Sequence, residues 1–226
     1  MTARLAVLSG GVPPFVDPWH PFEAVARRVA ALGTAAGFDV ETTTDVAGRL
    51  ADLTDVDVLA VVAPSPAMRE PGEAGAEALA APVRGRAAAG LESFLARQVG
   101  VLGVHVGTTG LLGLPRWTEI IGARWVPGVS GHPPLGPAVL RGLPDPRVPA
   151  ERIELVDERY SGLEFAAGVV PLVDHERDGR RQPLVWAREV GTVRVIADTL
   201  GHDERSFDSP EHRELLTRCL AWLGRR

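Results

Sequence analysis

Apolar and polar positions follow two periodicities along the chain, and their alternation predicts strands separated by helices. Short apolar runs bounded by Gly, Pro or Asp are typical of buried strands, whereas apolar residues spaced three and four positions apart are typical of a helix that covers a sheet. The longest helical pattern covers residues 20–36, where one apolar stripe ends at Gly37. The predicted strands are residues 5–8, 38–42, 56–62, 99–102, 152–156 and 193–197, and the other predicted helices are 84–98, 117–123 and one that begins near Asp208.

This alternation is typical of an α/β fold in which helices cover both faces of a doubly wound, mostly parallel sheet. The Asp178-Gly179 pair between the apolar runs 169–174 and 184–188 predicts a C-terminal β-hairpin, because this dipeptide favours the tight turn of hairpins. Residues 126–149 are rich in Pro and Gly and are expected to be mostly loop, and residues 64–83 are expected to form a loop or a short helix.

The segment Gly103-Val104-His105-Val106-Gly107 places a histidine at a strand end where a nucleophile elbow would carry Ser or Cys. Such a turn exposes one side chain at the rim of the sheet, and its glycines permit the close approach of the backbone. Imidazole does not carry an acyl group as a hydroxyl or thiol does in the usual hydrolase scheme, but it can bind a metal, move a proton or contact a polar ligand. The sequence therefore predicts a hydrolase-like scaffold with altered chemistry centred on His105.

Further candidate side chains follow other predicted strands at the same end. In an open α/β sheet, ligands bind beyond the carboxyl ends of the strands. His20 follows the first predicted strand and His202 follows the last. The run Asp157-Glu158-Arg159-Tyr160 directly follows the predicted strand 152–156. With His132 in the loop rich in Pro and Gly, four of the six histidines can share one rim.

Each of these residues also has a simpler interpretation. His20 could cap its helix, and His132 or Glu158 could be ordinary surface residues. His175 and His212, on the hairpin and the final helix, are expected to be solvated and receive no role.

Composition narrows the classes of function. The chain contains no lysine or asparagine, and the absence of lysine excludes a Schiff-base lysine and a Walker lysine. Its net charge of −5 gives no basic face for nucleic acid or an anionic membrane. The single cysteine, Cys219, excludes an intramolecular disulfide and lies in a helical apolar stripe, which predicts a core position. No signal peptide or membrane-spanning segment is recognised, so we expect a cytoplasmic protein with no nucleic-acid or membrane partner. With no repeat or linker, we expect a single domain, residues 1–226.

Two further motifs do not carry the chemistry that they suggest. Ser9-Gly10-Gly11 is followed by Val12-Pro13-Pro14, which cannot open a helix onto a phosphate, so it is not a dinucleotide fingerprint. Gly128-Val129-Ser130-Gly131 lacks the second elbow glycine and has no clear strand before it, so a serine hydrolase is not expected.

Taken in order along the chain, the candidate residues resemble the ThuA-like (trehalose-utilisation) family, which shares the flavodoxin-like fold of the class I glutamine amidotransferase-like superfamily. The matching segments are His20-Pro21-Phe22, Gly37-Phe38-Asp39-Val40, Gly103-Val104-His105, His132-Pro133, Asp157-Glu158-Arg159-Tyr160, Trp186 and Leu200-Gly201-His202-Asp203.

The fold-level resemblance also indicates which chemistry is lost. Class I amidotransferases carry a cysteine at the elbow and a His-x-Glu after the last strand. Here His105 stands at the elbow, while His202-Asp203-Glu204 keeps the His-x-Glu, and Cys219 lies in the wrong element to substitute. We therefore expect no glutaminase activity.

The resemblance implies a role in carbohydrate metabolism, with a trehalose-like disaccharide or a keto-sugar as the small-molecule ligand. We expect hydrolysis or isomerisation through a His/Glu site, which could hold a divalent metal, zinc or manganese. A non-catalytic sugar-binding or regulatory module and a subunit of a homo-oligomer are the alternatives. The expected catalytic residues are His105, His202, Glu158 and Glu204, and the expected substrate-binding residues are His20, His132, Tyr160 and Asp203. The expected metal ligands are His105, His132 and His202. The tryptophans that could stack on a sugar ring or lie in the core are Trp19, Trp117, Trp125 and Trp186.

Overall fold

The computed structural model describes residues 2–66 and 79–225, and within these ranges nine strands form one mixed sheet. Their order across the sheet is β2-β1-β3-β4-β11-β10-β9-β6-β7. The first five of these strands pair in parallel, whereas each pair from β11 to β7 is antiparallel. The strands are β1 Arg4–Ser9, β2 Asp39–Thr43, β3 Val58–Val62, β4 Gly100–Val104, β6 Gly136–Gly142, β7 Arg152–Asp157, β9 Val170–Arg177, β10 Arg180–Val190 and β11 Val193–Asp198; β5 Ala123–Arg124 and β8 Glu164–Phe165 pair separately.

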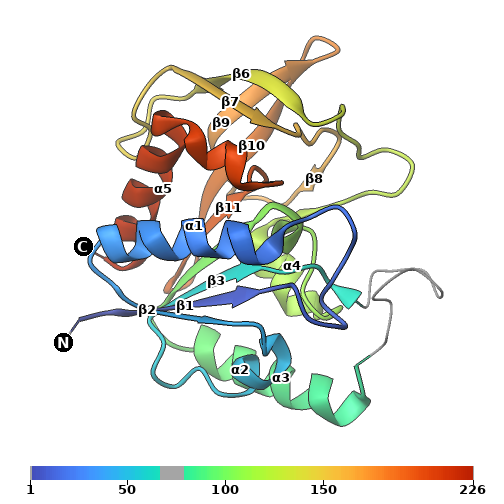
Figure 1. The fold of residues 1–226 in the computed structure, drawn as a ribbon, viewed down its shortest axis with the longest axis vertical. Coiled ribbons are helices and arrows are strands. Elements are labelled where there is room, and N and C mark those ends of the chain that lie inside the picture. Colours follow the sequence, from blue (N-terminus) through green and yellow to red (C-terminus); the bar gives the residue numbers. More distant parts are fainter. Residues whose placement is uncertain (1, 67–78, 226) are drawn as a thin grey trace.

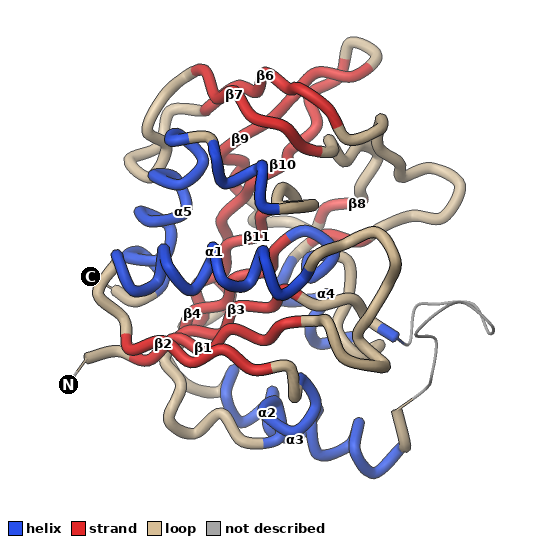
Figure 2. The backbone as a smooth tube through the Cα atoms, viewed as in Figure 1, coloured by secondary structure: helices blue, strands red, loops and turns tan. Residues whose placement is uncertain are grey.

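Helices lie on both faces of the parallel part of the sheet (Figures 1 and 2). α1 and α5 pack on one face, and α2, α3 and α4 pack on the other. Of the helices in the described ranges, none is both long and apolar enough to cross a membrane. The helices are α1 Phe22–Ala35, α2 Val46–Ala51, α3 Ala81–Leu95, α4 Pro115–Ile121 and α5 Pro210–Leu223, with short 3-10 helices η2 His105–Thr108 and η3 Glu204–Asp208.

Side chains that alternate along β1 show how the two layers of helices are held to the sheet. Leu5 and Val7 belong to the core beneath α1 and α5, whereas Ala6 and Leu8 belong to the core beneath α2 and α3, and all four are 0% exposed. Burying one leucine contributes about 1.5–3 kcal/mol, so a strand with two apolar faces is strongly held at the centre of the fold.

The predicted α/β architecture is confirmed, and the predicted hairpin is formed by β9 and β10 around Asp178 and Gly179. The structure adds β6 inside the predicted loop 126–149, where Pro and Gly hid an alternation of buried and exposed residues. It also adds α2, which begins at the N-cap residue Asp45. For the predicted loop or short helix at 64–83, residues 67–78 lie outside the described part of the chain.

His175 and His212 differ from the expectation that they are solvated, because both are buried. His212 is 0% exposed, and its Nε2 lies 2.8 Å from Asp198 Oδ2. Burial alone would lower the pKa of His212, but the Asp198 carboxylate raises it above its usual value. The polar side chains were mistaken for surface residues because their buried partners come from other elements.

Cys219 occupies the core position that the apolar stripe predicts, since it is 0% exposed on the sheet-facing side of α5. Burial raises the pKa of its thiol, so the reactive thiolate is scarce at neutral pH. We expect no modification by iodoacetamide in the native protein and complete modification in urea, measured by intact mass. Rapid labelling of the native protein would show that α5 opens locally.

Candidate active site

The polarity of the strands brings the candidate residues to one edge of the sheet. β1, β4 and β11 run in parallel, so the segments that follow them start at the same edge. β10, β9, β6 and β7 reverse direction one after another, which returns β7 to the direction of β11. Glu158 and Tyr160, which follow β7, are thereby delivered to the same edge as the histidines.

The Gly-x-His-x-Gly segment forms the sharp turn that its sequence predicts. His105 has a positive φ of 47°, in the left-handed region that non-glycine residues rarely adopt. The glycines permit close packing, because a Cβ on Gly107 would lie 2.3 Å from the carbonyl oxygen of Val61. The turn therefore aims an imidazole, only 2% exposed, out of the carboxyl end of β4.

Three imidazoles meet at this edge. The Nε2 atoms of His20 and His105 are 3.1 Å apart, and one ligand atom from each of His20, His105 and His202 lies within 4.8 Å of the others. Burial, followed by the neighbouring His20, lowers the pKa of His105 well below its usual value. His105 is therefore a neutral base near pH 7.

In two of these imidazoles, those of His105 and His20, Nδ1 is held by an oxygen acceptor. Nδ1–H of His105 donates to the Thr199 carbonyl at 2.8 Å, and Nδ1–H of His20 donates to the Asp17 carboxylate at 2.7 Å. Because an acceptor on Nδ1 places the lone pair on Nε2, each Nε2 can act as a ligand atom, and that of His105 also lies 3.2 Å from the Tyr160 hydroxyl. Burial alone would raise the pKa of Asp17, but the hydrogen bonds from His20 hold it below its usual value.

Glu158 joins the imidazole cluster to a fourth histidine. Its Oε2 lies 3.7 Å from His105 Nε2 and 3.5 Å from His202 Nδ1, whereas its Oε1 lies 3.2 Å from His132 Nδ1. The carboxylate raises the pKa of His202 above its usual value. His202 Nδ1 is buried and makes no hydrogen bond of good geometry, so it is an orphaned polar atom aimed at Glu158.

Tyr160 borders the cluster on the side of His132. Its hydroxyl lies 3.2 Å from His105 Nε2, and burial raises its pKa well above the usual value, so it is a hydrogen-bond donor. Nε2–H of the buried His175 donates to the Tyr160 carbonyl at 3.0 Å, which fixes the backbone beneath the phenol ring.

These side chains open into a cavity of about 990 Å³. Its wall includes His20, His132, Glu158, Tyr160 and His202, so it contains most of the residues predicted from the sequence. Of the four tryptophans considered, Trp19 and Trp125 line the cavity, whereas Trp117 and Trp186 are 0% exposed in the core.

Three predicted site residues do not line the cavity, and of these the buried His105 contacts the lining residues His20 and Tyr160. Asp203 caps η3 by accepting from the N–H of Arg205, and it pairs with the Arg205 guanidinium. Glu204 is the first residue of η3, and neither side chain is among those that line the cavity. The chain turns away into η3 directly after His202, so the carboxylate beside His202 is Glu158.

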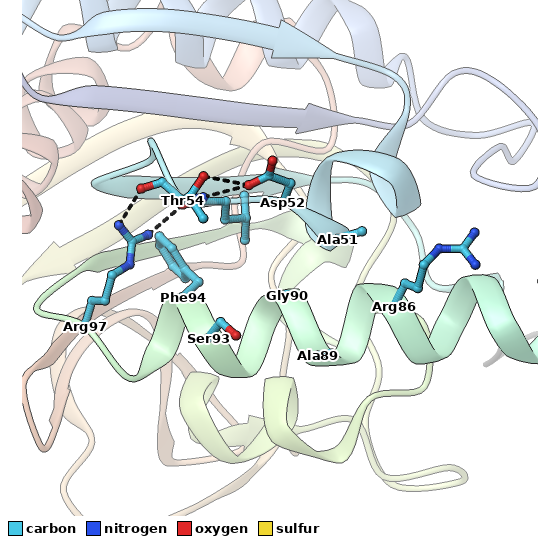
Figure 3. A pocket seen from close by; sticks show the side chains of 10 residues that line it. Ala51, Asp52, Thr54, Arg86, Ala89, Gly90, Ser93, Phe94 and Arg97 are labelled. Atoms are coloured by element: carbon cyan, nitrogen blue, oxygen red, sulfur yellow. Dashed lines mark hydrogen bonds between the residues drawn. The ribbon is translucent and has the colours of Figure 1, made fainter.

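A second cavity, of about 530 Å³, lies between α3 and the segment that leads into β3 (Figure 3). The Arg97 guanidinium at its wall donates to the main-chain carbonyls of Leu53 and Thr54, and Asp52 accepts from the Thr54 hydroxyl. Arg97 thus ties the segment before β3 to the end of α3.

Comparisons with known proteins identify the family and the fold of the chain. Residues 19–223 match the model of the ThuA family, whose description is "Trehalose utilisation". The chain belongs to the ThuA family. This membership indicates a carbohydrate-related role. No curated protein sequence matches the chain.

Solved structures share the ThuA-like fold at low sequence identity. A ThuA-like protein from Parabacteroides merdae is 15% identical with a TM-score of 0.72, over 99% of this chain and 90% of that one. One from Bacteroides uniformis is 14% identical with a TM-score of 0.72, over 98% and 91%. A beta-galactosidase from Rahnella sp. R3 is 11% identical with a TM-score of 0.59, over 96% of this chain but 30% of that one.

Sequence reasoning missed three groups that orient the site: Asp17, Asp157 and the Thr199 carbonyl. Asp17 lies three residues before His20 in a loop rich in Pro, a spacing typical of a side chain that turns back onto its own backbone. Asp157 stands next to Glu158, where the sequence drew attention to its neighbour. A main-chain carbonyl leaves no signal in the sequence.

Proposed function

We propose that the protein is a carbohydrate-processing enzyme in which His20, His105 and His202 bind a divalent metal, zinc or manganese. The observation that carries the proposal is the 3.1 Å separation between His20 Nε2 and His105 Nε2. In both rings, Nδ1–H already donates a hydrogen bond to an oxygen acceptor. Two facing lone pairs repel each other unless a proton or a metal ion lies between them. The low pKa of His105 disfavours the proton on that ring.

The donor set fits such an ion. Nitrogen ligands about 2.1 Å from a tetrahedral zinc lie about 3.4 Å apart. The Nε2 atoms of His20 and His105 lie 3.1 Å apart, and one ligand atom from each of the three imidazoles lies within 4.8 Å of the others. The orphaned His202 Nδ1 gains a partner when it binds a cation. When bound, the metal supplies Lewis acidity toward a sugar oxygen or a water molecule.

The other residues supply proton transfer and binding. Glu158 contacts both the imidazole cluster and His132, so it can accept a proton at the cluster and pass it toward the cavity. The Tyr160 hydroxyl donates a hydrogen bond beside His105. Trp19 and Trp125 offer aromatic faces to a sugar ring, as aromatic walls do in many ligand sites. Trehalose-like disaccharides and their keto forms are the proposed substrates, with hydrolysis or isomerisation as the reaction.

Metal analysis of untagged protein, together with turnover of trehalose and keto-disaccharides, tests this function. We expect about one equivalent of metal and a loss of turnover in a chelator that the metal restores. Glu158→Gln should lower kcat by about 10²–10⁴-fold, as expected for a lost general base. Glu154→Gln, on the exposed face of β7 shortly before Glu158, is the matched control and should leave turnover unchanged.

Two outcomes would contradict the proposal. A protein that neither contains metal nor gains thermal stability from zinc or manganese would refute the metal site. Binding of the sugars without turnover, in metal-loaded protein, would instead support a sugar-binding or regulatory module.

A further inference from the structure

Asp157 is a buried carboxylate at the carboxyl end of β7 that the proposed chemistry does not use. It is 1% exposed, and its oxygens accept three main-chain hydrogen bonds. The N–H of Glu158 donates at 2.7 Å, that of Gly201 at 2.7 Å and that of His202 at 3.3 Å. Two of these donors belong to residues whose side chains lie in the imidazole cluster.

These hydrogen bonds join two segments that strand pairing does not connect. β10, β9 and β6 lie between β11 and β7 in the sheet, so no ladder links the end of β7 to the segment after β11. The Asp157 carboxylate spans this separation in one step. It therefore joins the segment that carries Glu158 to the segment that carries His202.

The segment after β11 needs such an anchor because its backbone is irregular. Gly201 has a φ of 94°, which L residues rarely adopt, and a Cβ there would lie 3.0 Å from Val104 Cγ1. The N–H of Thr199 donates to the Leu184 carbonyl at 2.9 Å, whereas the N–H groups of Gly201 and His202 donate to Asp157. The Thr199 carbonyl that holds His105 lies in the same loop, so the position of the loop affects two imidazoles.

We propose that Asp157 is a positioning residue that holds the loop of His202 against Glu158 and so preorganises the metal-binding cluster. The inference rests on the proposed metal site, but the anchoring itself is independent of any ion. Groups that orient metal ligands typically change metal affinity by about 10–100-fold when they are lost. Asp157 does this through main-chain N–H groups rather than through the imidazole rings.

Asp157→Asn tests the proposal, because it keeps the size of the side chain and replaces one acceptor oxygen with an NH₂ that cannot accept from an N–H. We expect zinc affinity, measured by competition with a chelating dye, to fall by about 10–100-fold. Hydrogen exchange should become faster at the amides of Gly201 and His202 while the amides of β11 stay protected. Asp174→Asn is the matched control, since Asp174 is a 3% exposed carboxylate on β9 that pairs with Arg141 and Arg181.

The readouts separate this proposal from the metal site. Unchanged exchange at Gly201 and His202 in Asp157→Asn, with unchanged zinc affinity, would overturn the positioning role. A wild-type protein that binds no zinc would refute the metal site, yet faster exchange at these two amides would still uphold the anchor.

If Asp157→Asn does not fold, Gly201→Ala displaces the same loop from the other side while Asp157 stays in place. We expect it to weaken zinc binding by a similar factor, because its Cβ is forced against Val104. Wild-type zinc affinity in this variant would contradict the proposal.

Discussion

His105→Asn is expected to abolish stoichiometric metal binding while leaving the protein folded. Asparagine tolerates the positive φ at this position better than other non-glycine residues do, so the turn is retained while the imidazole is lost. Loss of a group that only orients a metal ligand reduces metal affinity by up to about 100-fold, so loss of a direct ligand should reduce zinc affinity by more than this. Metal content after dialysis and the zinc dissociation constant measure the effect.

Two further histidine variants show which imidazoles bind the ion. His20→Asn should behave like His105→Asn, because its Nε2 lies 3.1 Å from that of His105. His132→Asn should keep the metal, since His132 reaches the three clustered imidazoles through Glu158 and Tyr160. The reverse order of effects would favour the ligand set His105, His132 and His202 predicted from the sequence.

His212→Leu is expected to destabilise the fold by about 3–5 kcal/mol, because it leaves the Asp198 carboxylate buried without its partner. Both side chains of this pair are 0% exposed, and the pair joins α5 to the end of β11. Urea denaturation measures the loss. Arg152→Ala is the control, because Arg152 and Glu154 form an exposed pair whose loss should cost within about 1 kcal/mol.

The cost of His212→Leu should depend on pH. The pKa of His212 is raised in the folded state, so its contribution is fully present below the unfolded value of about 6.5 and is lost as pH rises through the folded value. The difference in stability from the wild type should therefore be larger at about pH 5.5 than at about pH 9. A difference that grows toward alkaline pH would contradict a charged His212.

Strand ends were the part of the site that the sequence could predict. His105 directly follows one apolar run and His202 lies in the short loop after another, and the polarity of parallel strands is enough to bring them to one edge. His20 and His132 come from irregular loops, whose course depends on hydrogen bonds such as those to Asp17. Periodicity carries no information on such loops, so it could not decide which of these two imidazoles joins His105.

The lack of information on long-range contacts in the sequence also explains where the predicted fold differs from the structure. β6 alternates Ala138 and Leu140 inward with Val139 outward, but the surrounding prolines and glycines are typical of loops. His175 and His212 are polar residues in amphipathic elements, where solvent exposure is the default expectation. Their partners, Tyr160 and Asp198, lie 15 and 14 residues away, and only the folded chain shows that these polar groups satisfy each other.

The pairing of β6 with β9 gives the protein a natural line of partial unfolding. Only two residue pairs, Arg141 with Asp174 and Gly142 with Val173, join the β6–β7 ribbon to the rest of the sheet by strand register. If the ribbon detached as a cooperative unit, it would withdraw Glu158 and Tyr160 and break the hydrogen bonds that the N–H groups of Gly201 and His202 donate to Asp157. Detachment of the ribbon would thus remove the proton-transfer groups and the anchor of His202 in a single event, while His105 stayed at the end of β4.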